Sequence, residues 1–240
     1  CANGGYDFSA LDSLIEQNAR SGLKTALSQA NLGHLGFNHW DPVIVDRKED
    51  FFRHLGKRYR DNPHILCYEI YNEPDAYQFS GNEQARALVC GAFRDYLKHE
   101  FESIGALNMS AGTNYTRWED IMLPEDVAAN CALCLSYQWG RFLQSSLSGF
   151  LWACTRALQA ADPNHPVLTQ VAERRGALDA FQVGSWPPVV FSVHMAFGGR
   201  HGGDNNMVQA YSLAKVLEEP LWQDEFIFNY PEGSDKPGGP

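Results

Sequence analysis

Apolar residues recur at helical spacing in several stretches of the chain. The clearest face belongs to Ser136–Ala160, where the apolar positions are Phe142, Leu143, Leu147, Phe150, Leu151, Cys154 and Leu158. Gly22 and the Asp162-Pro163-Asn164 run follow two of these stretches as stop signals. The spacing predicts helices over Asp12–Ser21, Asp46–Tyr59, Glu83–Ser103, Ser136–Ala160 and around Asn206–Leu217.

Short apolar runs lie between the predicted helices. They predict five strands, at Leu23–Ser28, His64–Tyr71, Pro166–Val171, Val189–His194 and Leu221–Phe226, and a weaker one at Leu107–Thr113. Alternating helices and strands indicate an α/β fold with a parallel sheet. We therefore expect a TIM-type (β/α)8 barrel that is incomplete, because such a barrel needs eight strands. Residues 1–230 are predicted to form this domain, and residues 231–240, which lack an apolar anchor, a flexible tail.

Two of the predicted strands end in a glutamate. The apolar run from Ile65 leads into Asn72-Glu73-Pro74, and Pro74 disfavours a helix at Glu73. The run from Leu221 leads to Glu225. Because the carboxyl ends of barrel strands form the active-site face, both carboxylates are expected in one cleft. A pair of this kind serves glycoside hydrolysis, where one carboxyl protonates the leaving oxygen and the other attacks the anomeric carbon.

Purely structural roles for these glutamates are the alternative to this interpretation. A glutamate at a strand end is often simply solvated or pairs with a helix terminus, and this applies most to Glu225. Glu69, earlier on the same strand as Glu73, is better explained by a structural ion pair or hydrogen bond. The Asn-Glu-Pro ending of a buried strand is the more specific signal.

The segments Gly56–Tyr59, Asn62–His64 and Tyr68–Pro74 resemble the fourth-strand region of clan A glycoside hydrolases. That clan includes family 5 cellulases and mannanases and family 42 β-galactosidases. The resemblance implies that Glu73 is the acid/base and that Asn72 holds the sugar 2-hydroxyl.

Later segments resemble the clan in the same order. Ala161–Val167 is similar to the entry to its fifth strand, Phe191–His194 to its sixth, and Pro220–Phe226 to its seventh. The resemblance implies that His194 lines the cleft and that Glu225 is the nucleophile. The long separation of the two glutamates implies an insertion within Tyr77–Trp139.

Two departures from the clan pattern stand out. The clan often has a tyrosine two residues after the sixth-strand histidine, but Met195, Ala196 and Phe197 follow His194 here and carry no hydroxyl. The first two strands and the eighth, which usually supplies a tryptophan under the catalytic sugar, are not recognised.

Aromatic and histidine side chains are further candidates for sugar binding. Trp40, Trp139 and Trp222 are each a sugar-stacking platform or a packing residue. His194 hydrogen-bonds sugar hydroxyls or supports the core, and His39 is the better candidate for a core histidine. The glycine-rich run at 198–204 matches no phosphate-binding fingerprint and is expected to be a mobile loop.

Composition narrows the classes of partner. The formal net charge is −10 and the pI about 5.2, which argues against nucleic acid and anionic membranes and fits a neutral polymer or a small-molecule substrate better. The resemblance implies that this substrate is an oligo- or polysaccharide. No apolar run is long enough to span a membrane, and no signal peptide is recognised before Cys1. Cys131 and Cys134 form a single C-x-x-C, so thiols or one local bridge are favoured over a metal site. We expect no cofactor.

These observations predict a retaining β-glycosidase or endo-β-glycanase, such as a mannanase or cellulase. The alternative is a carbohydrate-binding barrel with impaired catalysis, which the missing tyrosine and strands favour and the two intact glutamates oppose. A metal-dependent barrel hydrolase ranks last, because no His-x-His pair or cluster of ligands is present.

Overall fold

The structure is a computed structural model that describes residues 5–28, 39–71, 83–124, 133–170, 190–197, 211–212, 214–216, 218 and 221–228. Its helices are α1 (Ser9–Arg20), α2 (Pro42–Tyr59), α3 (Glu83–Glu100), α4 (Ile104–Ala111), the 3₁₀ turn η1 (Trp118–Asp120) and α5 (Leu133–Ala161). Its strands are β1 (Thr25–Ser28), β2 (Ile65–Glu69), β3 (Val167–Gln170), β4 (Val190–Phe197) and β5 (Leu221–Phe228).

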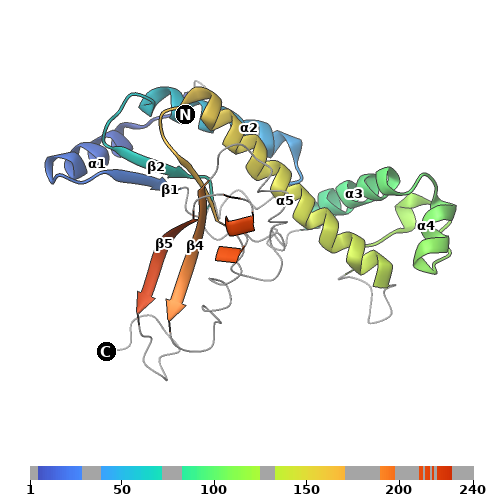
Figure 1. Ribbon diagram of the computed structural model, residues 1–240. Coiled ribbons are helices and arrows are strands. Elements are labelled where there is room, and N and C mark those ends of the chain that lie inside the picture. Colours follow the sequence, from blue (N-terminus) through green and yellow to red (C-terminus); the bar gives the residue numbers. More distant parts are fainter. Residues whose placement is uncertain are drawn as a thin grey trace, which may run out of the picture.

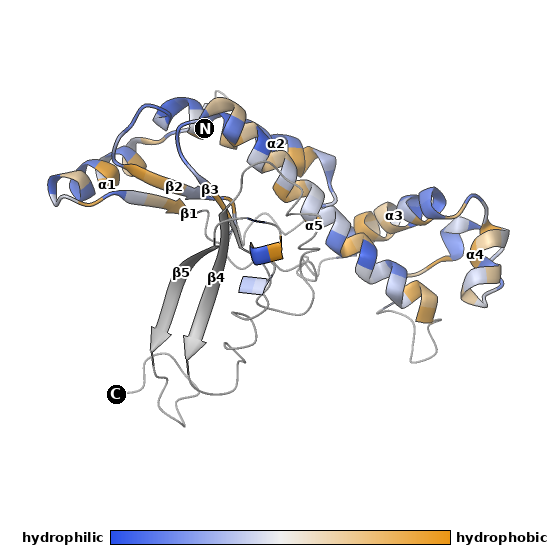
Figure 2. Cartoon of the chain, viewed as in Figure 1, coloured by the Kyte–Doolittle hydropathy of each residue, from blue (hydrophilic) through white to orange (hydrophobic). Residues whose placement is uncertain are grey.

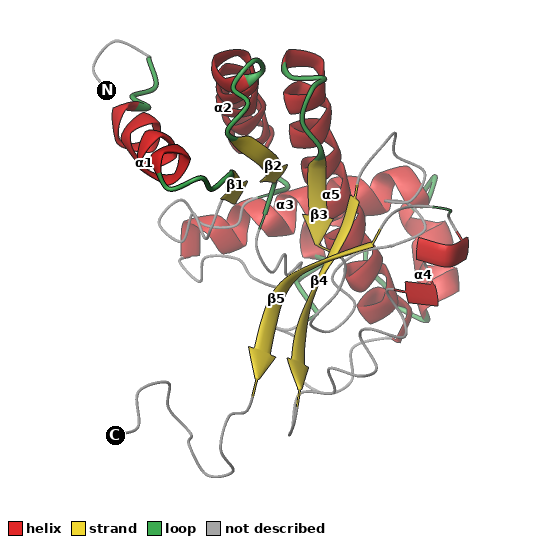
Figure 3. Ribbon diagram, turned by 60° about the vertical axis from the view of Figure 1, so that its left-hand side comes forward, coloured by secondary structure: helices red, strands yellow, loops and turns green. Residues whose placement is uncertain are grey.

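The five strands form one sheet in the order β1-β2-β3-β4-β5, and every neighbouring pair is parallel (Figure 1). In a doubly wound α/β fold the strand order reverses at a switch point, whereas a (β/α) barrel adds each strand beside the previous one. The unbroken order therefore matches an arc of a barrel. Helices α1, α2 and α5 stand side by side along one side of this arc (Figure 3).

The five predicted strands are present, with bounds that differ by a few residues, and the first four predicted helices correspond to α1, α2, α3 and α5. Residues 211–212 and 214–216 are helical, within the fifth predicted helix. The weaker strand at Leu107–Thr113 is wrong, because those residues belong mainly to α4. The Ser103 hydroxyl accepts a hydrogen bond from the Ala106 amide at 3.1 Å, and Gly112 ends the helix with φ +65°.

Helices α3 and α4 and the turn η1 lie between β2 and α5, within the stretch where an insertion was predicted. Helices α3 and α4 contact the N-terminal part of α5, and η1 contacts α3, whereas α2 packs against the C-terminal part of α5 (Figure 1). Helix α5 thus links α3 and α4 to the sheet. The predicted tail at 231–240 and the glycine-rich run at 198–204 lie outside the described residues.

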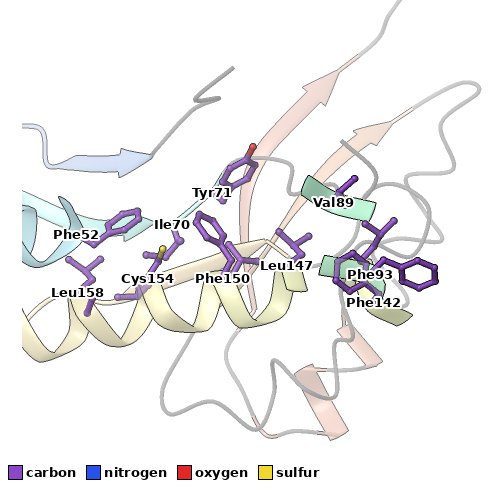
Figure 4. Packing of buried hydrophobic residues seen from close by; sticks show 14 of the residues in the cluster. Phe52, Ile70, Tyr71, Val89, Phe93, Phe142, Leu147, Phe150, Cys154 and Leu158 are labelled. Carbon is purple, nitrogen blue, oxygen red and sulfur yellow. The ribbon is translucent and has the colours of Figure 1, made fainter. Parts of the chain in front are cut away.

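One apolar core runs along the buried side of α5 (Figure 4). Its α5 members face β2 and α2 at one end and α3 at the other, and include Phe142, Leu147, Leu151, Cys154 and Leu158. Strands β1 and β2 are mainly hydrophobic along their length, whereas α1 and α2 alternate between hydrophobic and hydrophilic residues (Figure 2). This is the pattern of helices that cover a sheet on one side and meet solvent on the other.

Helices α2 and α5 approach each other closely at Gly56. A Cβ atom at this position would lie 2.9 Å from the Cβ of Ala161 and 3.1 Å from the carbonyl oxygen of Leu158. Two helices pack this closely only where a side chain is absent. Gly56 therefore sets the spacing of the two helices that cover β2.

A lysine is buried at the same interface. Lys48 on α2 is 7% exposed, and burial lowers its pKa to about 8. The free thiol of Cys154 on α5 is fully buried, which raises its pKa. Burial of the charged Lys48 ammonium therefore lowers the stability of the folded protein at neutral pH.

We expect Gly56→Ala to destabilise the protein by about 1–2 kcal/mol, because overpacking outweighs the gain in helix propensity. Gly91→Ala is the matched control, since a Cβ at this α3 position meets nothing within 4 Å. It should be neutral or stabilising by roughly 0.5–1 kcal/mol. Urea unfolding of both variants measures the difference, and an equal effect would contradict close packing at Gly56.

We expect Lys48→Met to stabilise the protein at pH 7 and to reduce the rise of the unfolding free energy with pH. The native pKa of Lys48 is about 8 against a usual value of 10.5, so between these values the unfolded chain binds more protons. Lys48 therefore makes stability rise with pH across this window, by at most roughly 3 kcal/mol. The wild-type minus variant unfolding free energy between pH 6 and 11 isolates this contribution. Exposed Lys57→Met should leave the profile unchanged.

Candidate active site

The carboxyl ends of the five parallel strands meet at one edge of the sheet, where the sequence predicted the catalytic cleft. One row of Cα partners crosses four strands and consists of Ser28, Glu69, Leu168 and Val190. Two residues further along, Gln170, Ser192 and Trp222 form the next row of the same parity. Residues in one row lie at the same level along the strand direction, so the rows align residues from strands that are far apart in sequence.

His194 on β4 is the Cα partner of Glu225 on β5. Val193 pairs with Gln223, so the register shifts between these two rows and Asp224 is the extra residue. An irregularity of this kind is a β-bulge, which re-aims the residues that follow it and is common beside active sites. Without it His194 would pair with Asp224. The backbone thus places two sequence-predicted site residues, His194 and Glu225, side by side.

Strand β2 presents alternate residues to opposite sides of the sheet. Ile70 lies against Phe52 and Cys154 on the helix side, and Tyr71 points away from α5 (Figure 4). Glu69 has the parity of Tyr71 and is 8% exposed. The predicted residues Asn72 and Glu73 follow directly but lie outside the described residues.

A buried carboxylate anchors β2 from the helix side. Asp162, which follows α5 and has no exposed surface, accepts a hydrogen bond from the Tyr68 hydroxyl at 2.6 Å. His165 Nδ1 lies 2.8 Å from the same carboxylate, and the backbone N–H of Asn164 donates a hydrogen bond to it at 2.9 Å. Burial and Asp162 raise the pKa of Tyr68, so its hydroxyl stays protonated and donates. This contact fixes the strand that leads to Glu73.

His39 and Trp40 lie directly before α2, whose N-cap Asp41 accepts a hydrogen bond from the Val43 amide at 2.9 Å. A helix that follows a parallel strand begins near that strand's carboxyl end, so both residues are at the candidate edge of the sheet. Their ring centroids are 4.8 Å apart in an edge-to-face arrangement. His39 is 5% exposed, as expected of a core histidine, and Trp40 is half-buried.

For Trp139, which the sequence left open between a sugar platform and a packing residue, the surroundings favour packing. Its side chain is 5% exposed on α5, and its ring lies 5.1 Å from that of Phe93 and 5.5 Å from that of Phe142. A ring enclosed by other rings offers little surface to a sugar, and Trp139 packs α3 against α5. Trp222, in contrast, stands on β5 beside Ser192, three residues before Glu225.

The described part of the chain contains no cluster of three or more potential metal ligands. Cys67, Cys90, Cys134 and Cys154 form no disulfide, and Cys131 of the C-x-x-C lies outside the described residues. Among the described helices, none has both the length and the apolar character to cross a membrane.

Sequence reasoning missed two features that position the site. The Asp162 anchor had a signal in the Asp-Pro-Asn-His turn, which was interpreted as a helix stop and as the entry to the next strand but not as an anchor. The bulge at Asp224 had no signal in the sequence, because an extra residue in one strand leaves the apolar pattern of β5 unbroken.

Comparison with known proteins identifies relatives of one kind. The model of the glycoside hydrolase 42 family, described as β-galactosidase, matches residues 37–197, more than half of the chain. β-Galactosidase BglY of Alicyclobacillus acidocaldarius is 27% identical over 133 residues, which cover 53% of this chain and 18% of that protein. β-Galactosidase BgaP of a Planococcus species is 24% identical over 216 residues, which cover 74% and 31%. The chain thus spans less than a third of the length of these relatives.

Solved structures show the same fold. A β-galactosidase from the haloarchaeon Halorubrum lacusprofundi superposes with a TM-score of 0.70 at 17% identity, over 98% of this chain and 42% of that one. A β-galactosidase from Bacillus circulans gives 0.67 at 18% identity, over 90% and 36%. These neighbours are (β/α)8 barrels, so the five-stranded sheet is an arc of an incomplete barrel of this type.

We expect Trp139→Ala to lower the free energy of unfolding by about 3–5 kcal/mol, the usual cost of removing a large aromatic side chain from a core. Tyr137→Ala on the same helix is the control, because Tyr137 is 60% exposed. It should change stability by about 0.5 kcal/mol or less. Denaturant unfolding compares the two, and a small loss for Trp139→Ala would restore it as a candidate platform.

Proposed function

This chain belongs to the glycoside hydrolase 42 family, and we propose that it hydrolyses β-linked galactosides with retention of configuration. The curated relatives are β-galactosidases, which favours a β-galactosidase over the mannanase or cellulase considered from the sequence. Glu73 is proposed as the acid/base and Glu225 as the nucleophile.

The observation that carries this proposal is the strand register. Glu69 and Val190 belong to one row of Cα partners. His194 lies four residues after Val190 on β4 and is the Cα partner of Glu225. In the sequence Glu73 follows Glu69 by the same four residues. This equal count supports the proposal that both carboxyl groups belong to one site at the carboxyl edge of the sheet.

Each carboxyl group has a separate task in double displacement. The Glu225 carboxylate attacks the anomeric carbon while Glu73 donates its proton to the leaving glycosidic oxygen. The glycosyl ester on Glu225 is then cleaved by a water molecule, whose proton returns to Glu73. This sequence needs the two carboxyl groups about 5–5.5 Å apart, with Glu73 protonated and Glu225 ionised at the start.

Supporting groups follow from the same placement. Asn72 is proposed to hold the sugar 2-hydroxyl and His194 to hydrogen-bond the sugar beside Glu225. Trp40 and Trp222 remain candidate platforms for the sugar ring. The bulge at Asp224 supports Glu225 as the nucleophile, because it gives Glu225 rather than Asp224 the position next to His194.

A carbohydrate-binding barrel without catalysis is the second candidate. The absence of a hydroxyl at Met195, Ala196 and Phe197 favours it, because no tyrosine from this segment can hold the nucleophile. Such a protein would bind galactosides without turnover.

We expect Glu73→Gln and Glu225→Gln each to reduce kcat for an aryl β-galactoside by at least about 10³-fold, since each removes a group that reacts in the transition state. Asp224→Asn is the control and should retain most of the activity. Proton NMR of the first product should show the β-anomer of galactose before mutarotation. Binding without turnover in the wild type would establish the non-catalytic alternative, and release of the α-anomer would exclude double displacement.

A further inference from the structure

A groove of about 480 Å³ lies between α2 and α5, apart from the candidate active site. Helix α2 contributes Glu49, Arg53 and Lys57, spaced four residues apart, and α5 contributes Trp152, Ala153, Arg156, Ala157, Ala160 and Ala161. The core residues of α2, among them Phe52 and Leu55, occupy the opposite stripe of that helix. The groove therefore opens away from the sheet, along the line where the two helices stand side by side (Figure 3).

Two cations in this groove have no acidic partner in the described part of the chain. Arg53 lies 3.2 Å from Asp50 and 3.7 Å from Glu49, so its charge is compensated within α2. Lys57 and Arg156 face the groove from opposite helices, are exposed, and make no ion pair with a described residue. In a chain with net charge −10, such a pair is a local positive site.

An aromatic ring and small side chains complete the groove. Trp152 is half-buried, and the Arg156 guanidinium lies 5.6 Å from its ring centroid. Alanines form much of the α5 wall, and the absence of a side chain at Gly56 keeps the helices close beneath it. The surface thus combines an apolar wall with two cations, one of which lies over the Trp152 ring, and this suits a ring with an apolar face that carries an acidic group.

We propose that this groove binds an acidic sugar unit of an oligosaccharide, with the sugar ring against Trp152 and its carboxylate or sulfate group between Lys57 and Arg156. The volume falls within the range of about 300–1,000 Å³ for small-ligand sites. A neutral galactoside would leave both cations without a counter-charge and is expected to bind much more weakly. The proposal is independent of catalysis, because none of the lining residues belongs to the proposed catalytic pair.

The test uses trigalacturonate and galactotriose as a matched acidic and neutral pair. Isothermal titration of the wild type in low-salt buffer should give saturable binding of the acidic trimer, weakened at 0.3 M salt. Lys57→Gln and Arg156→Gln should each weaken binding by about 3–10-fold, the loss of one charge-assisted contact at a solvent-exposed site. Trp152→Ala should weaken it by a similar factor. Lys24→Gln, which removes an exposed charge elsewhere, is the control.

The catalytic variants separate this site from the proposed active site. Binding of trigalacturonate should be unchanged in Glu225→Gln, whether or not that variant has lost turnover. Urea unfolding of each groove variant checks that its fold is intact. Equal binding of the neutral trimer, an equal effect of Lys24→Gln, loss of binding in Glu225→Gln, or no binding at millimolar ligand would each overturn the proposal.

Discussion

The hydrogen bonds between successive parallel strands constrain the rest of this structure. A parallel neighbour requires a crossover connection, usually through a helix. In the described part of the chain α2 precedes β2, α5 precedes β3, and helical residues at 211–212 and 214–216 precede β5. Because every neighbouring pair of strands is parallel, the carboxyl ends of strands separated by more than a hundred residues meet at one edge. The same hydrogen bonds set the register that makes Glu225 the partner of His194. The candidate site is a consequence of this pairing rather than of any local motif alone.

The helix layer has two roles because its two sides are chemically different. On the sheet side, α2 and α5 bury aliphatic and aromatic residues and hold β2 through Asp162 and Tyr68. Their close approach at Gly56 brings Lys57 and Arg156 to opposite sides of one outer groove. A single packing contact therefore influences both the strand that leads to Glu73 and the surface proposed to bind an acidic sugar.

The sequence was sufficient to predict where most of the described helices and strands lie and which type each one is. Apolar periodicity identified the five strands and the helices α1, α2, α3 and α5. It failed at Leu107–Thr113, where a serine cap and a glycine stop enclose a short helix. Side-chain surroundings were harder to predict. Trp139 belongs to an aromatic cluster with Phe93, a residue that approaches it only through the packing of α3 on α5. The Asp224 bulge and the α2–α5 groove likewise depend on contacts between segments distant in sequence.

The central claim is that Glu225 is the nucleophile of a retaining galactosidase, and covalent trapping tests it most directly. A 2-deoxy-2-fluoro-β-galactosyl fluoride carries a good leaving group, while the electron-withdrawing fluorine slows hydrolysis of the glycosyl ester. The account predicts a mass increase of one fluorogalactosyl group per chain, which peptide mapping assigns to Glu225. A label on another residue, or turnover of unmodified galactosides with no covalent label, would contradict it.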